Sequence, residues 1–558
     1  MGTRRRCLYR TCPLHIPTRC ILSVLFIFIT LVVTTGGAPS YAASGKLMGE
    51  TDVLTIYPKS NGGSLADGSR DSSGRQLMQA GSNDKETLHL RYIHRNSMES
   101  PARKEFPNRA EEIEELIAMD QMRVEGFSAG MIKWERADFD GASQTPSSSS
   151  PPPSADINDG AEVPSPAPGP LSYPYEDFLG RLFSGASFPG NVGQYFVKFA
   201  IGSPPQTFFF IADTGSDLVW VPCSLCSVCS METAVNGSSV FHAASSSTFS
   251  PIKCSAEECG LVPPPTFGSS LCILREPTSC TYGYSYSDSS QTTGVFAYDT
   301  ITMSSAVGES VHIDNVAFGC GTNNSGPSIT GIGGVIGLGQ GPISFTSQVG
   351  FMFGSKFSYC FTSFFNRNAS SALVFGDEFP GLELLSPKQY TPFLVNPQSE
   401  TFYYVDIEGF EVEGERLPIR SQLWRIKADG TGGAVIDSGT TLTFFVEAAY
   451  KVIIDAIAAR MSSFPRAAST AGLPICYNVS GVASPRLPQI TIAFKGGSLF
   501  QPPAENYFLS PKEDVFCPAF LASTTLNVLG NLLQQNYLVE YDRLRSRLGF
   551  AQARCSLS

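Results

Sequence analysis

Two short segments of the chain carry the same arrangement of an aspartate, hydroxyl side chains and a glycine. They are IADTGSDLVW at 211–220 and VIDSGTTLTF at 435–444. One Asp-Thr-Gly alone is weak evidence, because aspartate and glycine also form ordinary turns. Two copies 224 residues apart, each directly after an apolar strand, instead predict a pair of carboxylates, Asp213 and Asp437, that act together.

Such a pair can supply an acid and a base at the same time. A carboxylate at the end of an apolar strand is desolvated, and a glycine two residues later lets a second loop approach closely. Like charges about 3 Å apart cannot both ionise cheaply, so the pair shares a proton. The ionised carboxylate can activate a water that attacks a peptide carbonyl, while the protonated one supports the oxyanion. We therefore predict peptide hydrolysis with a bell-shaped pH profile centred in acid.

The neighbours of the two aspartates have predicted supporting roles. These neighbours are Thr214, Gly215, Ser216, Ser438, Gly439 and Thr440. Ser216 and Thr440 are placed to hydrogen-bond the outer carboxylate oxygens. Thr214 and Ser438 are expected to tie the two loops to each other.

The surrounding sequence indicates a mainly β protein. The 558 residues are 42% hydrophobic and 16% charged, with 52 glycines and 39 prolines, which favours strands and turns over a helical bundle. Alternating or apolar runs at 195–201, 208–212 and 402–407 read as strands, and helical spacing is clearest at 447–460. The net charge of −11 argues against nucleic acid as a partner, because that function needs a basic surface.

The first third of the chain reads as a leader. Arginines precede an apolar run at 21–33 and small residues near Ala42, which predicts a signal peptide at 1–42, with a signal anchor as the alternative. Residues 43–185 are expected to form a removable prosegment; a permanent stalk is the alternative. Within it, 108–122 predicts a helix with Ile113, Leu116 and Ile117 on one face, and 142–170 is a Pro/Ser-rich linker. The basic residues of the prosegment would neutralise carboxylates near the cleft at neutral pH, making it an intramolecular inhibitor.

From residue 193 onward the chain resembles the nepenthesin-type group of pepsin-like aspartic proteases. The matching motifs beyond the two aspartate segments are GQYFVKFAIGSPPQ (193–206), CSLCSVC (223–229), FGCG (318–321), FSYC (357–360) and VLGNLLQQNYLVEYD (528–542). LHLRYIHRNS (88–97) resembles the prosegments of that family. The resemblance implies a bilobal pepsin-like acid protease fold, in which two pseudo-twofold-related β-barrel-like lobes, 186–385 and 386–558, enclose a cleft. It also implies a monomer that acts on protein or peptide substrates without a cofactor.

The resemblance further implies a substrate flap. Tyr286 would lie at the tip of a hairpin that closes over substrate, with the Trp220 indole as its hydrogen-bond partner. Here Ser287 and Ser289 replace the glycines usual in the family. If those positions need positive φ, serine would strain or reshape the tip.

Twelve cysteines follow the leader, an even number that fits six disulfides in an oxidising compartment. They are Cys223, Cys226, Cys229, Cys254, Cys259, Cys272, Cys280, Cys320, Cys360, Cys476, Cys517 and Cys555. The family's pattern implies the pairs 223–226, 229–320, 254–280, 259–272, 360–555 and 476–517, although spacing alone does not settle connectivity. Zinc is the competing use of the closely spaced thiols, and the exported context favours disulfides, hence no metal.

Four sequons, at Asn236, Asn323, Asn368 and Asn478, are compatible with a glycoprotein of the secretory pathway, either extracellular, in the apoplast, or vacuolar. His242 and His312 lie outside any activating motif, so a Ser-His or Cys-His hydrolase is not indicated. The alternative of another class is a catalytically silent binding or inhibitor protein on the same fold. Both complete aspartate motifs favour the secreted aspartic endopeptidase.

Overall fold

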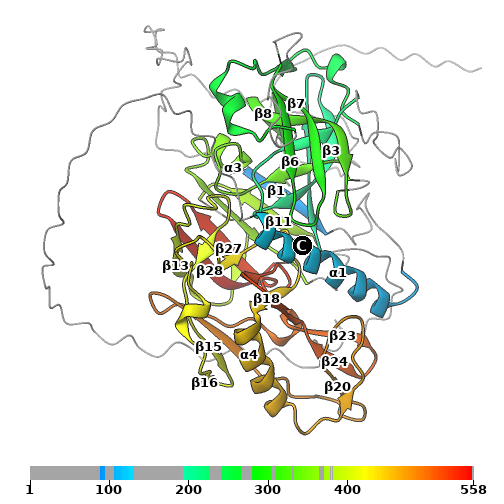
Figure 1. Ribbon diagram of the computed structural model, residues 1–558, viewed down its shortest axis with the longest axis vertical. Helices are drawn as coiled ribbons and strands as arrows, with labels where there is room; N and C mark the ends of the chain where they lie inside the picture. The colour runs from blue at the N-terminus through cyan, green and yellow to red at the C-terminus, as the bar shows by residue number, and fades with distance from the viewer. Residues whose placement is uncertain are drawn as a thin grey trace, which may run out of the picture. The chain divides into compact units, whose positions relative to one another are not determined.

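Strands form most of the structure, as the composition predicted. The computed structural model describes residues 88–94, 106–130, 193–224, 240–265, 279–304, 310–329, 332–363, 370–377, 379 and 381–555. Figure 1 shows the strands gathered in two lobes, green for the N-terminal one and yellow to red for the C-terminal one, with helix α1 (Arg109–Gly130) at the level between them. The expected signal peptide (1–42) and the linker (142–170) lie outside the described residues.

The N-terminal lobe is built on a long antiparallel hairpin and a short parallel pair. Its strands are β2 (Tyr195–Ile201), β3 (Gln206–Asp213), β4 (Trp220–Pro222), β5 (Ser250–Pro251), β6 (Thr281–Ser285), β7 (Gln291–Ser304), β8 (Ser310–Ser325) and β9 (Val335–Gly337). β7 pairs with β8, and β3 runs parallel to β9 with Asp213 opposite Gly337. The buried end of β3 therefore delivers Asp213 to the lobe interior.

The C-terminal lobe repeats that parallel pair. Its strands are β14 (Tyr404–Val405), β15 (Ile407–Val412), β16 (Glu415–Arg416), β17 (Ala434–Ile436), β18 (Thr443–Val446), β19 (Arg466–Ala467), β20 (Cys476–Asn478), β21 (Ile490–Phe494), β22 (Leu499–Phe500), β23 (Phe508–Lys512), β24 (Val515–Pro518), β25 (Phe520–Ser523) and β26 (Asn527–Leu529). β17 runs parallel to β26, and Asp437 follows β17 directly. The strand predicted at 402–407 is divided at Asp406, because β14 pairs with β13 and β17 whereas β15 pairs with β21 of another sheet.

A central antiparallel sheet joins the two lobes. Beyond β2, it consists of β1 (Leu88–His94), β10 (Lys356–Cys360), β11 (Ser371–Phe375), β12 (Glu383–Leu384), β13 (Gln389–Leu394), β27 (Tyr537–Asp542) and β28 (Arg547–Arg554). The leader strand β1 is inserted between β2 and β11. The leader is thus a structural part of the sheet that connects the lobes.

Helix α1 confirms the predicted helix in the leader and extends beyond it. Asn108 caps it: the Asn108 Oδ1 accepts from the Glu111 backbone N–H at 3.1 Å, and Asn108 Nδ2 donates to the Glu111 carboxylate at 2.7 Å. This reciprocal pair satisfies N–H groups that the first turn leaves without partners. The buried apolar stripe includes the expected Ile113, Leu116 and Ile117.

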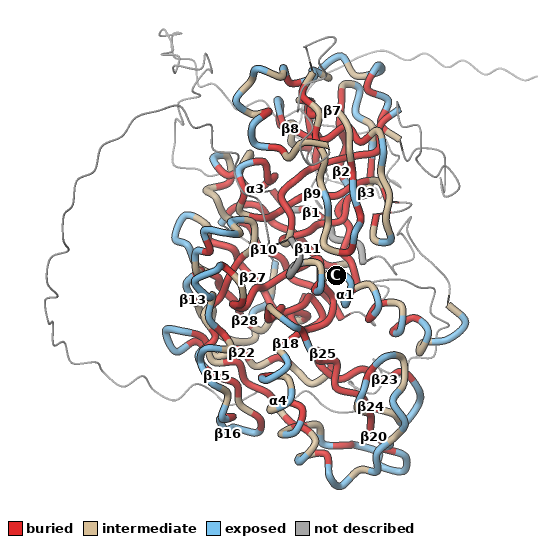
Figure 2. The backbone as a smooth tube through the Cα atoms, viewed as in Figure 1, coloured by how far each residue is buried: buried red, intermediate tan, exposed pale blue. Residues whose placement is uncertain are grey.

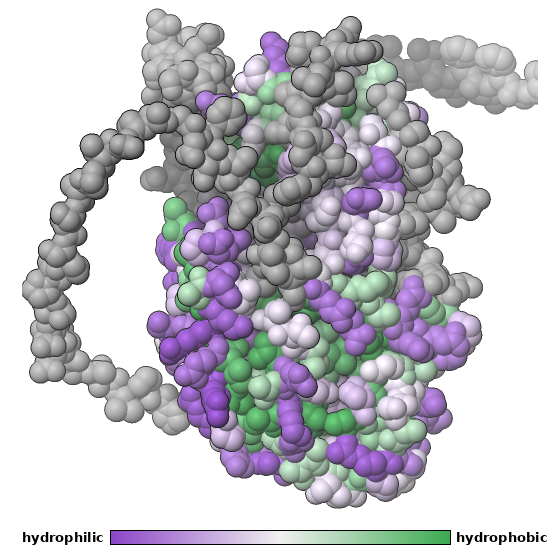
Figure 3. Space-filling view, viewed as in Figure 1, coloured by the Kyte–Doolittle hydropathy of each residue, from purple (hydrophilic) through white to green (hydrophobic). Residues whose placement is uncertain are grey.

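The core runs through both lobes. Figure 2 shows buried backbone concentrated in the strands and in the sheet between the lobes, with the exposed residues in loops and outer edges. Helix α4 (Glu447–Arg460) packs the predicted Ile453, Ile454 and Ile457 against this core, and a short helix α3 (Phe345–Gln348) follows β9. On the face shown in Figure 3, apolar side chains gather over the C-terminal lobe between polar ones.

Four disulfides lie within the described residues. Cys360–Cys555 and Cys476–Cys517 confirm the pairing that the family resemblance implied. Two other pairings correct it: Cys223 is bonded to Cys320 and Cys259 to Cys280. The reason is strand register. β4 and β8 run in parallel with Val221 opposite Cys320, so the β4 end reaches β8 and not a neighbour in sequence. Cys254 is also disulfide-bonded, whereas Cys226, Cys229 and Cys272 lie outside the described residues.

Peptide mapping under non-reducing conditions tests the corrected pairing. We expect mass spectrometry to find cross-linked peptides joining Cys223 to Cys320 and Cys259 to Cys280, because these pairs are within bonding distance across the register of the N-terminal lobe. The Cys360–Cys555 peptide serves as the internal control. Recovery of a Cys223–Cys226 or Cys259–Cys272 bridge would contradict the structure.

Candidate active site

The structure brings Asp213 and Asp437 together in the interior, with 1% and 0% of their surfaces exposed. Each approaches the glycine of the opposite motif. A Cβ at Gly439 would lie 2.2 Å from Asp213 Oδ1, and a Cβ at Gly215 would lie 2.9 Å from Asp437 Oδ1. Both distances are too short for real carbon atoms, so glycine is required at these two positions for the carboxylates to meet.

Each carboxylate accepts a matching set of hydrogen bonds from its own loop. Asp213 accepts from the Gly215 N–H at 3.0 Å and from Ser216 Oγ at 2.7 Å. Asp437 accepts from the Gly439 N–H at 2.9 Å and from Thr440 Oγ1 at 2.6 Å. The near-repeat in the sequence therefore produces a near-symmetric site.

Two reciprocal hydrogen bonds connect the loops. The Thr214 N–H donates to Ser438 Oγ at 3.0 Å, and the Ser438 N–H donates to Thr214 Oγ1 at 2.8 Å. Behind the second loop, the side-chain amides of Asn531 and Gln534 donate to backbone carbonyls of residues 438 and 437. These contacts hold the two aspartates in a fixed relation, so little reorganisation is needed for chemistry at the pair.

Arg123 of helix α1 bridges the two carboxylates. Its Nη2 is 2.6 Å from Asp213 Oδ1 and 3.2 Å from Asp437 Oδ2, and its Nε donates to Thr440 Oγ1 at 3.1 Å. The guanidinium is nearly buried, and burial by itself would lower its pKa, but Asp213 and Asp437 raise that pKa overall. The cation therefore stays charged against the pair.

Burial also raises the pKa of Asp213. Arg123 opposes this rise, and the nearby Asp437 charge adds to it. Without Arg123 the same carboxyl would have a still higher pKa, because the cation favours the ionised form. The Arg123 contact is consequently strongest when the pair is ionised and weakens as the pair takes up protons.

A second residue of the same helix binds the loop that carries Asp437. The Asp120 carboxylate is 2% exposed and accepts from the Thr441 N–H at 3.0 and 3.1 Å and from the Leu442 N–H at 2.5 Å. Burial raises the pKa of Asp120 from 3.8 to about 7, against the lowering effect of these N–H donors. Helix α1 is thus held by two charged residues three positions apart.

The hairpin of β6 and β7 covers the site from the other side. The Trp220 indole N–H donates to the Tyr286 hydroxyl at 2.7 Å. Ser289 adopts a positive φ of 68°, whereas Ser287 does not; the left-handed conformation costs a serine about 1 kcal/mol. A Cβ at Gly126 of α1 would lie 1.5 Å from the Ser287 carbonyl oxygen, so the helix passes directly against the hairpin tip.

Two charged residues of the site were not predicted from the sequence: Asp120 and Arg123. Asp120 interrupts the apolar stripe of α1 formed by Ile117 and Val124, and such an interruption was the available signal. Arg123 is a basic residue in a helix dominated by acids. Neither signal could identify the groups that these two side chains contact, because the two aspartate loops lie more than 80 residues away in sequence.

The other predicted residues fall at the surface or outside the described chain. Asn323 and Asn478 are exposed, and Asn236 and Asn368 lie in undescribed segments. His242 and His312 are far from an activating role: His312 Nδ1 contacts the Thr302 hydroxyl on β7. Within the described ranges, no cluster of three His, Cys, Asp or Glu side chains is arranged to hold a metal ion, and no helix there is long and apolar enough to cross a membrane.

Comparison with protein families matches both lobes. Residues 195–377 match the model described as xylanase inhibitor N-terminal, and residues 402–552 match xylanase inhibitor C-terminal. Aspartic proteinase nepenthesin-1 of Nepenthes gracilis is 35% identical over 66% of this chain and 79% of its own length. Protein ASPARTIC PROTEASE IN GUARD CELL 2 of Arabidopsis thaliana is 33% identical over 69% and 77%. Aspartic proteinase nepenthesin-2 of Nepenthes gracilis is 34% identical over 66% and 79%.

Among solved structures the fold is shared at lower identity. The crystal structure of edgp aligns with a TM-score of 0.53 and 21% identity, over 64% of this chain and 91% of that one. Basic 7S globulin from soybean aligns with a TM-score of 0.50 and 18% identity, over 64% and 93%. These likenesses support the bilobal pepsin-like fold.

Replacing Arg123 by glutamine tests the charge balance at the pair. We expect Arg123→Gln to destabilise the full-length chain at neutral pH by about 3–5 kcal/mol, the usual cost of removing one partner from a buried ion pair. The loss should shrink as the pH falls, because protonated carboxylates no longer need the cation. Thermal unfolding followed between pH 7 and pH 4 measures both effects, and a loss that is constant across this range would contradict the assignment.

Proposed function

The chain belongs to the nepenthesin-type family of pepsin-like aspartic proteases, and from this premise we propose that it is an aspartic endopeptidase that hydrolyses peptide bonds at acid pH. The observation that carries the proposal is the meeting of Asp213 and Asp437, each with its own N–H and hydroxyl donors. The family implies peptides as substrates. The geometry of the pair supports hydrolysis as the reaction.

The mechanism follows from the environment of the pair. Burial and the Asp437 charge raise the pKa of Asp213, which favours a state with one shared proton at mildly acid pH. In that state one carboxylate can accept a proton from the attacking water, and the other can protonate the developing oxyanion and later the leaving nitrogen. The hairpin that carries Tyr286 would close over the bound peptide and exclude bulk water.

The competing proposal is a silent binding or inhibitor protein. The two matching family models are described as xylanase inhibitors, and this description favours it. The geometry of the site argues against this alternative. Two buried neighbouring carboxylates lower the stability of the protein unless a cation or a proton compensates them, and a binding function does not require them.

The Asp213→Asn variant tests the proposed chemistry. We expect the wild-type protein, after acid treatment, to cleave denatured globin near pH 3 to 5 and to be blocked by pepstatin. Asp213→Asn should lower kcat by at least about 10²–10⁴-fold, since it removes an acid/base group. The conservative variant keeps the volume, and its remaining oxygen can accept one of the two hydrogen bonds that Asp213 accepts from Gly215 and Ser216. Full activity of this variant would exclude the pair as the catalytic site, and an inactive, pepstatin-insensitive wild type would favour the inhibitor.

We propose further that the leader acts as an inhibitory prosegment. Support comes from α1, which lies against both the hairpin tip and the aspartates: Gly126 abuts Ser287, and Arg123 contacts Asp213 and Asp437. A peptide cannot occupy the same space. The leader strand β1 in the central sheet adds a second attachment.

Asp120 allows a test of how acid releases the helix. The bound helix has Asp120 with a pKa of about 7, against an ordinary value of 3.8. Between pH 3.8 and about 7, Asp120 is protonated when the helix is bound and ionised when the helix is released. The proton taken up by Asp120 therefore favours binding of the helix as the pH falls. Asp120→Asn keeps an acceptor oxygen but cannot take up this proton. Because this variant is neutral at every pH, it lacks the cost of burying an ionised carboxylate, so we expect it to hold the helix at least as firmly as wild type and to activate at a pH no higher than that of wild type.

The measurement is the fraction of active protein after incubation at a series of pH values, together with N-terminal sequencing of the product. Glu114→Gln is the matched control, because Glu114 is exposed on the same helix. An activation pH above that of wild type would contradict the role of Asp120. A fully active protein whose N-terminus begins directly after the signal would contradict the prosegment itself.

We also propose the secretory pathway as the location. The bonded cysteines support it, because structural disulfides persist in oxidising compartments. The exposed sequons at Asn323 and Asn478 are accessible to glycosylation. Recovery of the mature, reduced protein from the cytosolic fraction of cells would contradict this proposal.

A further inference from the structure

The loop that carries Asp213 holds a second buried carboxylate, Asp217. Asp217 is 7% exposed. Its Oδ1 accepts from the Gly341 N–H at 2.9 Å, and its Oδ2 accepts from Thr401 Oγ1 at 2.6 Å. Its backbone N–H donates to the Tyr284 hydroxyl at 3.1 Å. The mechanism above does not use this group.

The chain around Asp217 is shaped to accommodate it. Three glycines at alternate positions follow the direction of β9, and each faces Asp217. A Cβ at Gly337 would lie 2.2 Å from the Asp217 carbonyl carbon, and Cβ atoms at Gly339 and Gly341 would lie 2.4 and 2.3 Å from its carboxylate oxygens. Because alternate residues of an extended segment point to the same side, this spacing leaves a fitted space for one carboxylate.

Asp217 connects three parts of the molecule that must move or hold together in a hydrolysis cycle. Thr401 belongs to the segment that enters the C-terminal lobe before β14, and its carbonyl accepts from the Gln340 N–H at 2.9 Å. Tyr284 lies on β6 of the hairpin, with its ring centroid 5.3 Å from that of Tyr286. The third part is the Asp213 loop itself.

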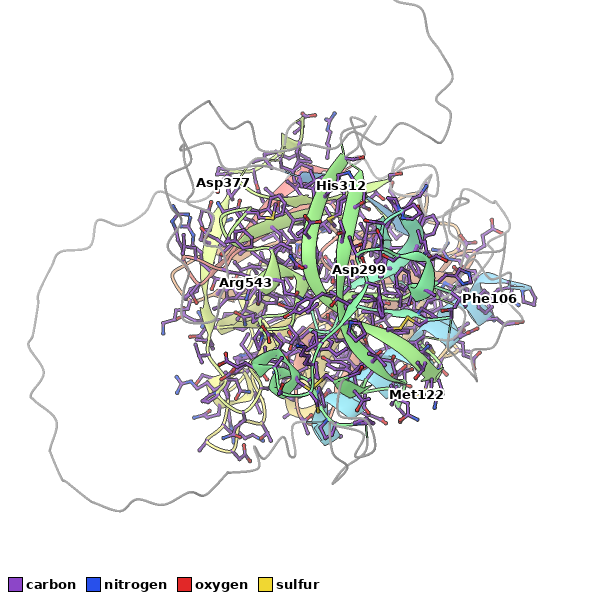
Figure 4. The ribbon with its side chains drawn as sticks, turned by 90° about the horizontal axis from the view of Figure 1, so that it is seen from above. Phe106, Met122, Asp299, His312, Asp377 and Arg543 are labelled. Carbon is purple, nitrogen blue, oxygen red and sulfur yellow. A yellow bond between two sulfur atoms is a disulfide. The ribbon has the colours of Figure 1, made fainter. Side chains whose placement is uncertain are left out.

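Several neighbouring groups act on the pKa of Asp217. Burial raises this pKa most, and the Asp213 charge raises it further. The hydrogen bonds from Thr401 and Gly341 and the charge of Arg543 lower it. The phenols of Tyr284 and Tyr403 also face it, and burial raises the pKa of both, so they stay neutral. Arg543 lies in the turn between β27 and β28 (Figure 4), where its Nη2 donates to the Gln340 carbonyl at 3.1 Å.

We propose that Asp217 is a positioning residue for peptide hydrolysis, an inference that rests on the function proposed above. Its carboxylate holds the Asp213 loop against Gly341 and Thr401, and at pH values where it is ionised its negative charge strengthens proton binding by Asp213. The hydrogen bonds described for this carboxylate go to Gly341 and Thr401 and not to Asp213 or Asp437. Its effect reaches the reaction through the place and the proton affinity of Asp213.

Kinetics of the acid-activated protein test this role with a peptide substrate over a range of pH. Asp217→Asn keeps an oxygen acceptor and removes the charge. We expect the basic limb of its kcat/KM profile to move to lower pH by about one unit, because the loss of a like charge lowers the pKa of the pair. Asp217→Ala also loses the hydrogen bonds, and we expect kcat to fall about 10²-fold with KM little changed, as for a displaced reacting group.

Two pairs of variants separate positioning from simple stability. Thr401→Ser keeps the donor hydroxyl and should retain wild-type kcat, whereas Thr401→Val should lower it. Asp299→Asn is the control, because Asp299 is a buried carboxylate on β7 (Figure 4) that accepts from hydroxyls and a backbone N–H but belongs to neither aspartate loop. It should leave the pH profile unchanged. Titration with pepstatin counts the correctly folded sites in every sample.

Each outcome decides the inference. Asp217→Asn with the kcat and basic limb of wild type would overturn it. So would a loss of activity that disappears once rates are divided by the number of pepstatin-binding sites, since that result means a role in folding alone. An inactive wild type would overturn the proposed function and this inference together, whereas an active wild type that is abolished by Asp213→Asn isolates the Asp217 result.

Discussion

The structure depends on one constraint, the burial of two neighbouring carboxylates that are bridged by one arginine. Asp213 and Asp437 are almost fully removed from water, and two like charges in such a place are unstable unless a proton or a cation compensates them. Each lobe supplies the same local geometry around its aspartate. A parallel strand pair ends at each aspartate, a glycine admits the opposite carboxylate, and hydroxyl and N–H donors fix its oxygens. The reciprocal bonds between Thr214 and Ser438 make the two halves one rigid unit.

The compensation of charge explains why the leader is built into the fold. In the full chain the cation is Arg123, held in place by an apolar helix face and by a strand in the central sheet. When that cation leaves, a shared proton is the remaining way to reduce the repulsion, and the pair then has the protonation state that hydrolysis needs. The proposed inhibition by the leader and the proposed catalysis therefore both depend on how the charge of the same pair is compensated.

The sequence was sufficient where a feature is local or repeated. The two aspartate motifs, the mainly β class and the apolar face of α1 could be predicted because spacing and periodicity encode them directly. The contacts between segments that are distant in sequence could not be predicted. Asp217 belongs to the first motif, yet Gly341 and Thr401 lie more than 120 residues away, so nothing near it revealed its environment. The pairing of Cys223 with Cys320 depends in the same way on the register of β4 and β8, which cysteine spacing does not contain.

The two charged residues of α1 respond to acid in opposite directions. Arg123 favours the ionised pair, so its contact weakens as Asp213 and Asp437 take up protons. Asp120 is unfavourably buried while ionised, because its pKa is raised to about 7, so its contact with Thr441 and Leu442 improves as the pH falls below that value. In mild acid the two effects on helix binding therefore oppose each other, since one contact gains while the other weakens. Below the ordinary pKa of an aspartate, near 3.8, Asp120 is protonated whether the helix is bound or free and gives no further gain. Any further protonation of the pair then acts against the Arg123 contact without opposition, which is the direction that the proposed release of the helix in acid requires.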